Sequence, residues 1–81
     1  MHFVYILKSQ KDLSRFYVGF THDLQRRIDQ HNDPNEPTWT KRFMPWQLET
    51  YLVFKEEKIA KKFELYLKSH SGKAFLKNHL L

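Results

Sequence analysis

Five polar side chains stand out because they border the apolar faces of predicted strands and helices. They are Tyr5, Tyr17, Arg27, His31 and Glu64. A carboxylate beside an apolar face needs a partner, because burying it unpaired is energetically expensive. For Glu64, the Arg27 guanidinium or a divalent cation would each serve. The chemistry indicated is therefore an ion pair between two helices or a metal-binding site.

The two tyrosines belong to a predicted hairpin. Residues 2 to 8 (HFVYILK) are apolar on both faces, which is typical of a central strand covered on each side. The stretch SQKDLS is rich in turn-forming residues, and RFYVGF is again β-branched and aromatic, so the two runs should pair antiparallel. Gly19 marks either a break or a place where the backbone comes close to another group.

A helix is predicted through DLQRRIDQHN, with Thr21 or Asp23 as its N-cap. At about 100° per residue, Arg27 and His31 project on the side that carries Leu24, which turns inward. Two cationic or titratable side chains are therefore expected to border the buried face of this helix.

The remaining elements complete an α+β domain. Residues 32 to 46 contain all three prolines and no regular period, which predicts a long loop, and such loops are usually functional or disordered. QLETYLVF alternates as a strand does, and the apolar spacing over residues 56 to 68 predicts a helix that stops near Gly72. Residues 73 to 81 supply a short third helix. The predicted order is β-β-α-β-α-α, with helices packed on a small three-stranded sheet.

Length and composition limit the possibilities further. A chain of 81 residues has room for a single domain, residues 1–81, and its formal charge of +5 favours a polyanionic partner such as nucleic acid. The chain has no cysteine, no signal-like segment and no apolar stretch near the about 20 residues of a membrane span. We therefore expect a cytoplasmic protein that does not bind membranes.

Several common site types are excluded. A single glycine in the first half of the chain rules out a P-loop or a dinucleotide-binding fingerprint. The five histidines lack zinc-like pairing, the nearest candidate pair being His70 with His79. Spacing supports no Ser/His/Asp arrangement.

The tyrosine motifs resemble those of a known family. VYI, followed after a short spacer by YVG and then by a threonine, an Asp-Leu pair and an arginine, resembles the GIY-YIG nuclease superfamily. YVGFTHDLQRRIDQHN looks like the second strand and first helix of that family. TWTKRFMPWQLETYLVF and AKKFELYLKSHSGKAFL resemble its small stand-alone bacterial branch. The resemblance covers nearly the whole chain and implies a three-stranded antiparallel sheet flanked by helices.

The resemblance also assigns positions. It places the motif glycine at Gly19 and the catalytic positions at Tyr5, Tyr17, Arg27, His31 and Glu64. The glycine of the first motif is replaced here by Phe3. An asparagine that some relatives carry in the last helix is replaced by Leu76, with Asn78 two residues later, so its role is absent or relocated.

By this resemblance the protein is a metal-dependent endonuclease. Glu64 would hold a single Mg²⁺ or Mn²⁺, and Arg27 would clamp the scissile phosphate and stabilise its transition state. Tyr17 is expected to position the attacking water, with Tyr5 and His31 polarising the network. The sequence leaves open which tyrosine activates the water.

The predicted loop offers nucleic-acid contacts. Trp39, Lys41 and Arg42 interleave an aromatic ring with positive charges, which suits stacking on unpaired bases and phosphate contact, although Trp39 could equally seal the core. The expected substrate is DNA, in particular structured, branched or damaged DNA. Whether RNA is also a substrate stays open. Two alternative functions remain: a non-catalytic nucleic-acid-binding module, and an interaction domain whose inward polar cluster is merely structural. For Arg27 and Glu64 themselves, a structural salt bridge between two helices is also open.

Overall fold

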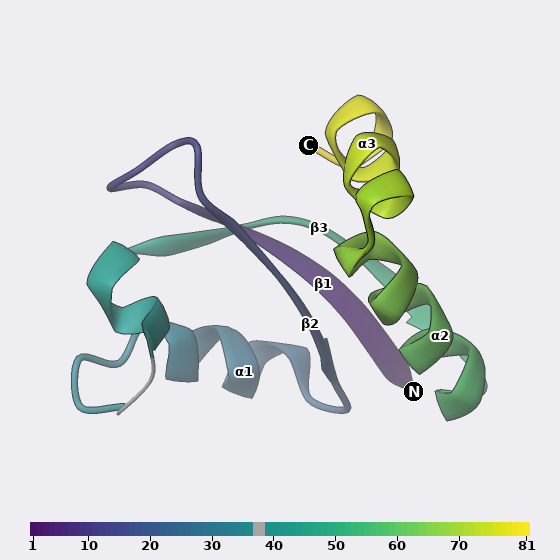
Figure 1. Cartoon of the computed structure of the whole chain (residues 1–81). Helices are drawn as coiled ribbons and strands as arrows, with labels where there is room; N and C mark the ends of the chain where they lie inside the picture. The colour runs from purple at the N-terminus through teal and green to yellow at the C-terminus, as the bar shows by residue number, and fades with distance from the viewer. Residues whose placement is uncertain (37–38) are drawn as a thin grey trace.

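The computed structural model describes residues 1–36 and 39–81, and it confirms the α+β fold and the order β-β-α-β-α-α (Figure 1). A short 3₁₀ helix, η1, precedes the last strand. The elements are β1 (His2–Ser9), β2 (Phe16–Thr21), α1 (Leu24–His31), η1 (Trp39–Phe43), β3 (Trp46–Phe54), α2 (Glu57–Lys68) and α3 (His70–His79).

The three strands form one antiparallel sheet in the order β2-β1-β3, so β1 is the central strand, as its two apolar faces predict. Tyr5 lies opposite Gly19 on β2 and opposite Tyr51 on β3. The pairing of β1 with β3 is irregular between Ile6 and Leu7. The register places Tyr5 at the centre of the sheet.

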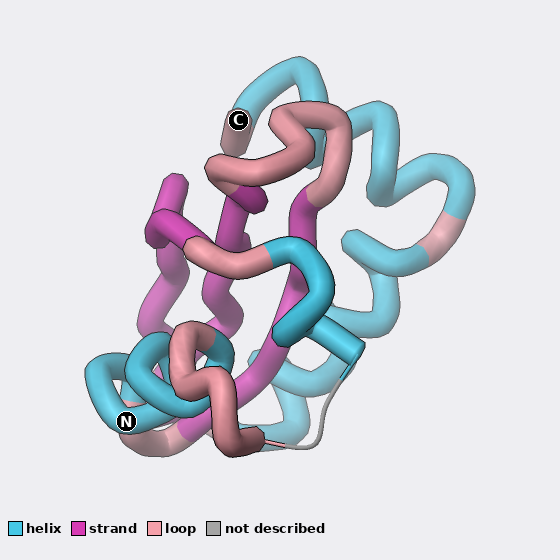
Figure 2. The backbone as a smooth tube through the Cα atoms, turned by 90° about the vertical axis from the view of Figure 1, so that its left-hand side faces the viewer, coloured by secondary structure: helices cyan, strands magenta, loops and turns pink. Residues whose placement is uncertain are grey.

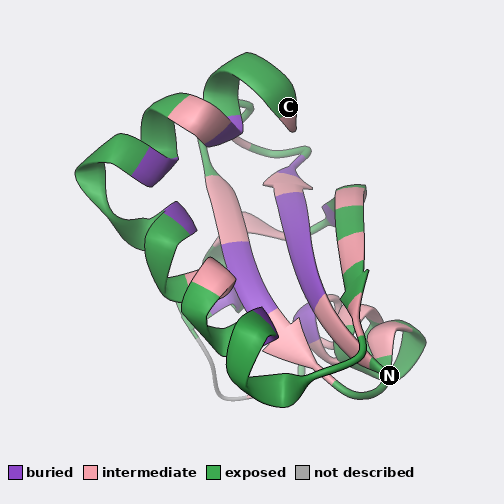
Figure 3. Cartoon of the chain, turned by 90° about the vertical axis from the view of Figure 1, so that its right-hand side faces the viewer, coloured by how far each residue is buried: buried purple, intermediate pink, exposed green. Residues whose placement is uncertain are grey.

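Helices cover both faces of the sheet (Figures 1 and 2). On one face, α2 and α3 enclose an apolar cluster whose buried members are Val4, Ile6, Val18, Ala60, Leu67 and Leu76. On the other face, α1 and η1 enclose a cluster whose buried members are Tyr5, Leu7 and Trp46. Figure 3 shows buried positions along the strands and on the inner side of the helices. Residues that alternate along β1 therefore enter two different cores.

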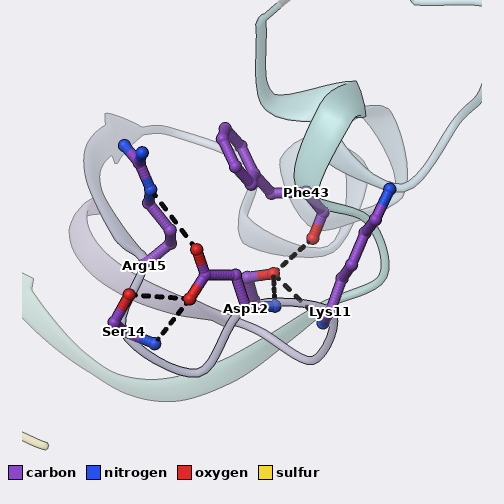
Figure 4. A network of polar contacts seen from close by, with 6 residues as sticks. Lys11, Asp12, Ser14, Arg15 and Phe43 are labelled. Carbon is purple, nitrogen blue, oxygen red and sulfur yellow. Dashed lines mark hydrogen bonds and ion pairs between the residues drawn. The ribbon is translucent and has the colours of Figure 1, made fainter.

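The hairpin turn is held by polar contacts (Figure 4). Asp12 Oδ1 accepts hydrogen bonds from the Ser14 amide at 3.1 Å and the Ser14 hydroxyl at 2.6 Å, and Asp12 Oδ2 lies 3.6 Å from Arg15 Nε. The Ser9 hydroxyl donates to the Phe43 carbonyl at 2.5 Å. The turn is thereby fastened both to itself and to the end of η1.

The predicted long loop is wrong in part. It contains η1, and β3 begins at Trp46, while residues 37 and 38 lie outside the described part of the chain. Asp23, one of the two predicted N-caps of α1, accepts a hydrogen bond from the Arg26 amide at 3.2 Å. No helix in the described ranges is both long and apolar enough to cross a bilayer.

The predicted helix stop near Gly72 is also wrong. α2 ends at Lys68, and Ser69 caps α3 by accepting a hydrogen bond from the Gly72 amide at 3.1 Å. A Cβ at Gly72 would overlap the Tyr66 carbonyl and the Leu67 backbone. Gly72 therefore permits the close approach of two consecutive helices and does not end one.

Candidate active site

A buried hydrogen-bonded chain joins three elements on the α1 face of the sheet. The Tyr5 hydroxyl, from β1, lies 2.9 Å from His31 Nε2 at the end of α1. His31 Nδ1 lies 3.2 Å from the hydroxyl of Thr40 on η1. Tyr5 is fully buried and His31 is only 8% exposed. The chain Tyr5–His31–Thr40 is thus shielded from solvent, with both ring nitrogens of the imidazole partnered.

Asn32, which follows His31 in the sequence, fixes the position of His31. The Asn32 side chain donates to the Trp46 carbonyl at 3.0 Å and accepts from the Trp46 amide at 2.6 Å. The Trp46 indole N–H in turn donates to the Thr40 carbonyl at 2.8 Å. These bonds join the end of α1, the 3₁₀ helix η1 and the start of β3, and so hold the imidazole and its hydroxyl partner in place relative to each other.

Gly19 provides the space in which Tyr5 lies. The two residues pair across β1 and β2, and a Cβ at Gly19 would overlap the Tyr5 Cζ and hydroxyl oxygen. The phenol therefore crosses β2 where the strand has no side chain, and this direction carries its hydroxyl to His31. The close approach that the sequence suggested at Gly19 is to this ring; a contact between Gly19 and nucleic acid stays a prediction.

Burial determines the protonation states of Tyr5 and His31 in the hydrogen-bonded chain. It raises the pKa of the Tyr5 phenol far above its ordinary value, and the neighbouring Tyr17 hydroxyl adds to the rise while the Arg27 guanidinium opposes it. Burial, together with the charge of Arg27, lowers the pKa of His31 to about 4. Both groups are neutral near pH 7. We assign the phenol as donor to Nε2, which leaves the Nδ1–H to donate to Thr40.

Tyr17 lies beside the chain and is partly exposed. Its ring centroid is 4.6 Å from that of His31, 6.1 Å from that of Tyr5 and 5.8 Å from that of Trp39. The two tyrosines are therefore neighbours on one face of the sheet. They differ in access, because Tyr5 is sealed from solvent and Tyr17 is not.

A cleft of about 440 Å³ opens beside Tyr17. Its aromatic wall includes Tyr17 and Trp39, which is 53% exposed, and its positive charges are Lys68 and Lys73. The cleft passes the edge strand β2 and joins η1 to the α2–α3 side of the molecule. It thereby brings aromatic rings and ammonium groups from distant parts of the sequence around one phenol.

Arg27 lies at the rim of the α1 face. Its side chain is exposed, and Nη1 donates to Gln30 Oε1 at 3.1 Å. Its charge nevertheless acts on both Tyr5 and His31, lowering the pKa of each. Arg27 thus borders the buried face, as the helical period predicts, and its exposed guanidinium approaches the hydrogen-bonded chain from the solvent side.

Glu64 lies on α2, beside Lys68 of the cleft. Its side chain is 18% exposed, and Oε2 lies 3.1 Å from Lys68 Nζ, one helical turn further on. The carboxylate charge contributes to the raised pKa of Tyr5, which places Glu64 within electrostatic range of the phenol. Within the described part of the chain the ion-pair partner of Glu64 is Lys68, so the alternative of a structural Arg27–Glu64 bridge gains no support.

The surroundings of Glu64 suit a hard cation better than a transition metal. Mg²⁺ keeps several waters and is usually bound by one or two carboxylates together with substrate phosphates. Within residues 1–36 and 39–81, Glu64 belongs to no group of three potential ligand side chains. A lone, partly exposed carboxylate beside a lysine-lined cleft fits Mg²⁺ or Mn²⁺ held jointly with a phosphate.

Other predicted positions lie apart from this site. Lys41 and Arg42 are exposed on η1, and neither lines the cleft beside Tyr17. Leu76 is fully buried in the apolar cluster under α2, and Asn78 is exposed on α3. Leu76 therefore cannot replace the polar side chain that some relatives carry in this helix.

Sequence reasoning missed two residues of the site, Thr40 and Lys73. Thr40 gave no signal, since a threonine in a proline-rich stretch is common, and its role depends on the fold of η1. Lys68 follows Glu64 by one helical turn, a spacing that indicates a helix-surface ion pair. Lys73 lies beyond the break between α2 and α3 and reaches the cleft only because α3 folds back.

Comparison with known proteins now places the chain. The model of the GIY-YIG catalytic domain matches residues 1–78. The chain belongs to the GIY-YIG family. The family is one of nucleases, and the motif residues on which the resemblance depended, Tyr5 and Tyr17 to Gly19, form the neighbouring strands described above.

Its relatives are small proteins of similar length. The chain is 36% identical over 72 residues to the UPF0213 protein YazA of Bacillus subtilis, covering 89% of this chain and 71% of the relative. It is 36% identical over 76 residues to a UPF0213 protein of Staphylococcus saprophyticus, covering 94% and 90%. The solution NMR structure of a UPF0213 protein from Bacillus halodurans matches with a TM-score of 0.57 and 29% identity, covering 95% of this chain and 82% of that one. The fold of this chain is therefore shared with that UPF0213 protein.

Proposed function

We propose that this GIY-YIG protein is a divalent-metal-dependent endonuclease that hydrolyses phosphodiester bonds in DNA, with structured, branched or damaged DNA as its preferred substrate. The observation that carries the proposal is the cleft beside Tyr17. It combines an accessible phenol, an exposed indole and two ammonium groups, with the Glu64 carboxylate paired to one of them. The formal net charge of +5 favours the same polyanionic partner.

Tyr17 is the residue proposed to contact the attacking water. Tyr5 has the same functional group but is fully buried, so its hydroxyl cannot meet solvent without rearrangement. Tyrosine is an inefficient general base near neutral pH, so proton transfer to Tyr17 has to accompany attack on phosphorus. Tyr17 therefore orients the water first. As the new P–O bond forms, Tyr17 takes the proton of the water while its own phenolic proton passes to an oxygen of the phosphate.

Tyr5, His31 and Thr40 act as positioning residues behind Tyr17. The neutral imidazole accepts from Tyr5 and donates to Thr40, so both of its nitrogens are engaged and neither is free to take a proton from water. The Tyr17 ring packs 4.6 Å from this imidazole. A fixed, buried chain on that side limits the rotation of Tyr17 and holds its hydroxyl toward the cleft.

Arg27 is proposed to bind the scissile phosphate. Its guanidinium is exposed at the rim of the site, carries a permanent charge and offers paired donors for phosphate oxygens. Charge that develops on the phosphate during attack would be stabilised from this side. The existing bond to Gln30 holds the side chain along α1 before substrate arrives.

Glu64 is proposed to hold one Mg²⁺ or Mn²⁺ together with the substrate phosphate. When bound, such an ion supplies Lewis-acid stabilisation of the phosphate and the leaving oxygen. To provide its carboxylate, Glu64 has to release Lys68, whose ammonium can then contact a neighbouring phosphate. The exchange costs little because the ammonium remains close to negative charge.

The preference for distorted DNA follows from the surface. A small domain with one short exposed 3₁₀ segment offers little to read base pairs in a groove. An exposed indole at Trp39 suits an unpaired or unstacked base, with Lys41 and Arg42 on the same element contacting flanking phosphates. We expect this activity in the cytoplasm, and RNA is a substrate to be compared directly.

One observation favours a second candidate function. The Glu64 carboxylate is paired with Lys68 at 3.1 Å, which is an arrangement that a non-catalytic nucleic-acid-binding module could keep indefinitely. In that case the cleft would bind DNA, and Glu64 would only support Lys68. The two functions differ in whether the bound phosphodiester is cleaved.

The test is cleavage of supercoiled plasmid and of a branched DNA duplex with Mg²⁺ or Mn²⁺. We would compare the parent with Glu64→Gln, Arg27→Ala and Tyr17→Phe, and with two matched controls, Glu49→Gln and Lys77→Ala, which change the same charges elsewhere. We expect each site variant to lower the cleavage rate by about 10²-fold or more and each control to retain it. DNA affinity, measured by fluorescence anisotropy, should survive in Glu64→Gln and Tyr17→Phe.

The outcomes separate the functions. Equal cleavage by the parent and all site variants would indicate a contaminating nuclease and overturn the proposal. Tight binding with no cleavage of any substrate by the parent would favour the non-catalytic module. Loss of cleavage in Glu64→Gln with unchanged affinity would support a metal-dependent reaction at this carboxylate.

A further inference from the structure

Three potential metal ligands meet at the opposite end of the β1–β2 hairpin from its turn. They are His2 at the start of β1, His22 just after β2, and Glu57 in the first turn of α2. One potential ligand atom from each lies within 4.8 Å of the others. His22 Nε2 and Glu57 Oε1 are 3.3 Å apart, close to the about 3.4 Å that separates two ligands of a tetrahedral zinc ion.

The hairpin register brings the two histidines together. Phe3 pairs with Thr21, so one further step along both strands places His2 opposite His22. Their ring centroids are 4.7 Å apart, and Phe20 packs against both rings, at 6.0 Å from His2 and 5.2 Å from His22. The pair is therefore a product of strand pairing, which the spacing of histidines in the sequence does not reveal.

One histidine atom in this cluster lacks a partner. His2 Nδ1 is buried and makes no hydrogen bond within the described ranges. A buried, unpaired imidazole nitrogen is costly, and such atoms usually have a partner in protein, water or metal. The simple alternative, an ion pair between His22 and Glu57, leaves this atom unexplained.

We propose that His2, His22 and Glu57 bind a transition-metal ion of the Zn²⁺ class. Two imidazoles and a carboxylate form a mixed nitrogen and oxygen donor set, which suits Zn²⁺ and related ions, whereas Mg²⁺ prefers oxygen ligands alone. Three protein ligands leave a fourth position for water. This site differs chemically from the lone carboxylate assigned to Mg²⁺ or Mn²⁺ above.

The site is separate from the proposed catalytic centre. Glu57 precedes Glu64 by two turns of α2, which corresponds to about 10 Å along the helix axis. A metal here would join the start of β1, the segment that leads into α1 and the start of α2. The elements that continue from these segments, β1, α1 and α2, carry Tyr5, Arg27 and Glu64 respectively. The ion would therefore stabilise the frame around the catalytic cleft without taking part in the reaction.

The test uses protein with its own N-terminus and no histidine tag, treated with a chelator and then titrated with Zn²⁺ by calorimetry. We expect one Zn²⁺ per chain and a rise in Tm with Zn²⁺ that equimolar Mg²⁺ does not produce. His22→Ala and Glu57→Gln should weaken Zn²⁺ binding by more than about tenfold. The matched controls His70→Ala and Glu49→Gln should bind as the parent does, and so should Glu64→Gln.

A second measurement guards against variants that fail to fold. In the unaltered protein, Zn²⁺ should shift the imidazole NMR signals of His2 and His22 and leave those of His70 and His79 unchanged. The absence of Zn²⁺ binding, or binding that persists equally in His22→Ala and Glu57→Gln, would overturn the proposal. Since Glu64→Gln separates the two sites, failure here would leave the nuclease proposal untouched, and the reverse also holds.

Discussion

The two faces of β1 build different kinds of core from neighbouring residues. Ile6 points toward α2 and α3 into a cluster whose buried members are all apolar. Tyr5, the residue before it, points toward α1 and ends in a hydrogen bond to His31. Both side chains are fully buried. Equal burial therefore serves stability on one face and the orientation of polar groups on the other.

The difference shows how a small domain can support a polar site. A buried hydroxyl and imidazole are tolerated because each finds a partner, and the apolar cluster on the other face supplies the hydrophobic stabilisation that the polar chain does not. The α1 face of the sheet can therefore contain buried polar groups that would otherwise destabilise the fold. Substitutions on the two faces should separate stability from activity.

The largest expected effect is on the apolar face. Ile6→Ala removes a fully buried side chain from the cluster and should lower the free energy of unfolding by about 2–5 kcal/mol, measured by urea denaturation. At a temperature where the variant is folded, the cleavage rate per molecule should stay near that of the parent. Tyr5→Phe is the matched change on the other face: it should cost about 1–3 kcal/mol, because His31 Nε2 loses its partner, and it should slow cleavage. A large loss of activity in folded Ile6→Ala would contradict the division between the faces.

Much of the fold could be predicted from the sequence. The double-sided apolar run at residues 2 to 8 correctly indicates the central strand, and the period of α1 places His31 on the buried side. The errors occur where local signals are ambiguous. Gly72 looks like a helix stop, yet its role is to let two helix backbones approach each other. Such contacts depend on tertiary packing that no local pattern contains.

The residues of the candidate site also fall into two groups: those that the sequence identified and those that only the tertiary fold brings to the site. The resemblance named Tyr5, Tyr17 and His31, and the structure brings all three together. Thr40 and Lys73 join the site only through the folding of η1 and α3. Side-chain direction was also beyond the sequence, because helical periodicity gives the face of a helix but not whether a long side chain such as that of an arginine folds inward or reaches solvent.

The pH dependence of the free energy of unfolding should reveal the buried, neutral His31 on the α1 face of the sheet. The pKa of His31 is about 4 in the folded protein and near 6.5 when the chain is unfolded, so below about pH 6.5 the unfolded state binds the extra proton. Stability is therefore complete above about pH 6.5 and falls as the pH drops toward 4. The loss attributable to His31 should approach about 3 kcal/mol.

This dependence can be isolated by comparison with His31→Gln. The side chains that face His31 are Tyr5, Tyr17, Thr40 and the guanidinium of Arg27. The gap in unfolding free energy between the parent and His31→Gln should therefore narrow from pH 7 to pH 4. A constant gap across that range would mean that His31 titrates normally and that the chain is not shielded.

The smallest of these effects tests how Gly19 makes room for the polar chain. Gly19→Ala places a methyl group where the Tyr5 ring lies, so it should cost about 1–3 kcal/mol and slow cleavage by displacing the phenol from His31. In a Tyr5→Ala background the same substitution meets no ring. Its cost should vanish or turn into a gain of a few tenths of a kcal/mol to about 1 kcal/mol, because alanine restricts the unfolded chain more than glycine does. Urea denaturation of the four proteins gives the coupling between the two positions, and purely additive effects would mean that Gly19 is required by the strand itself and not by Tyr5.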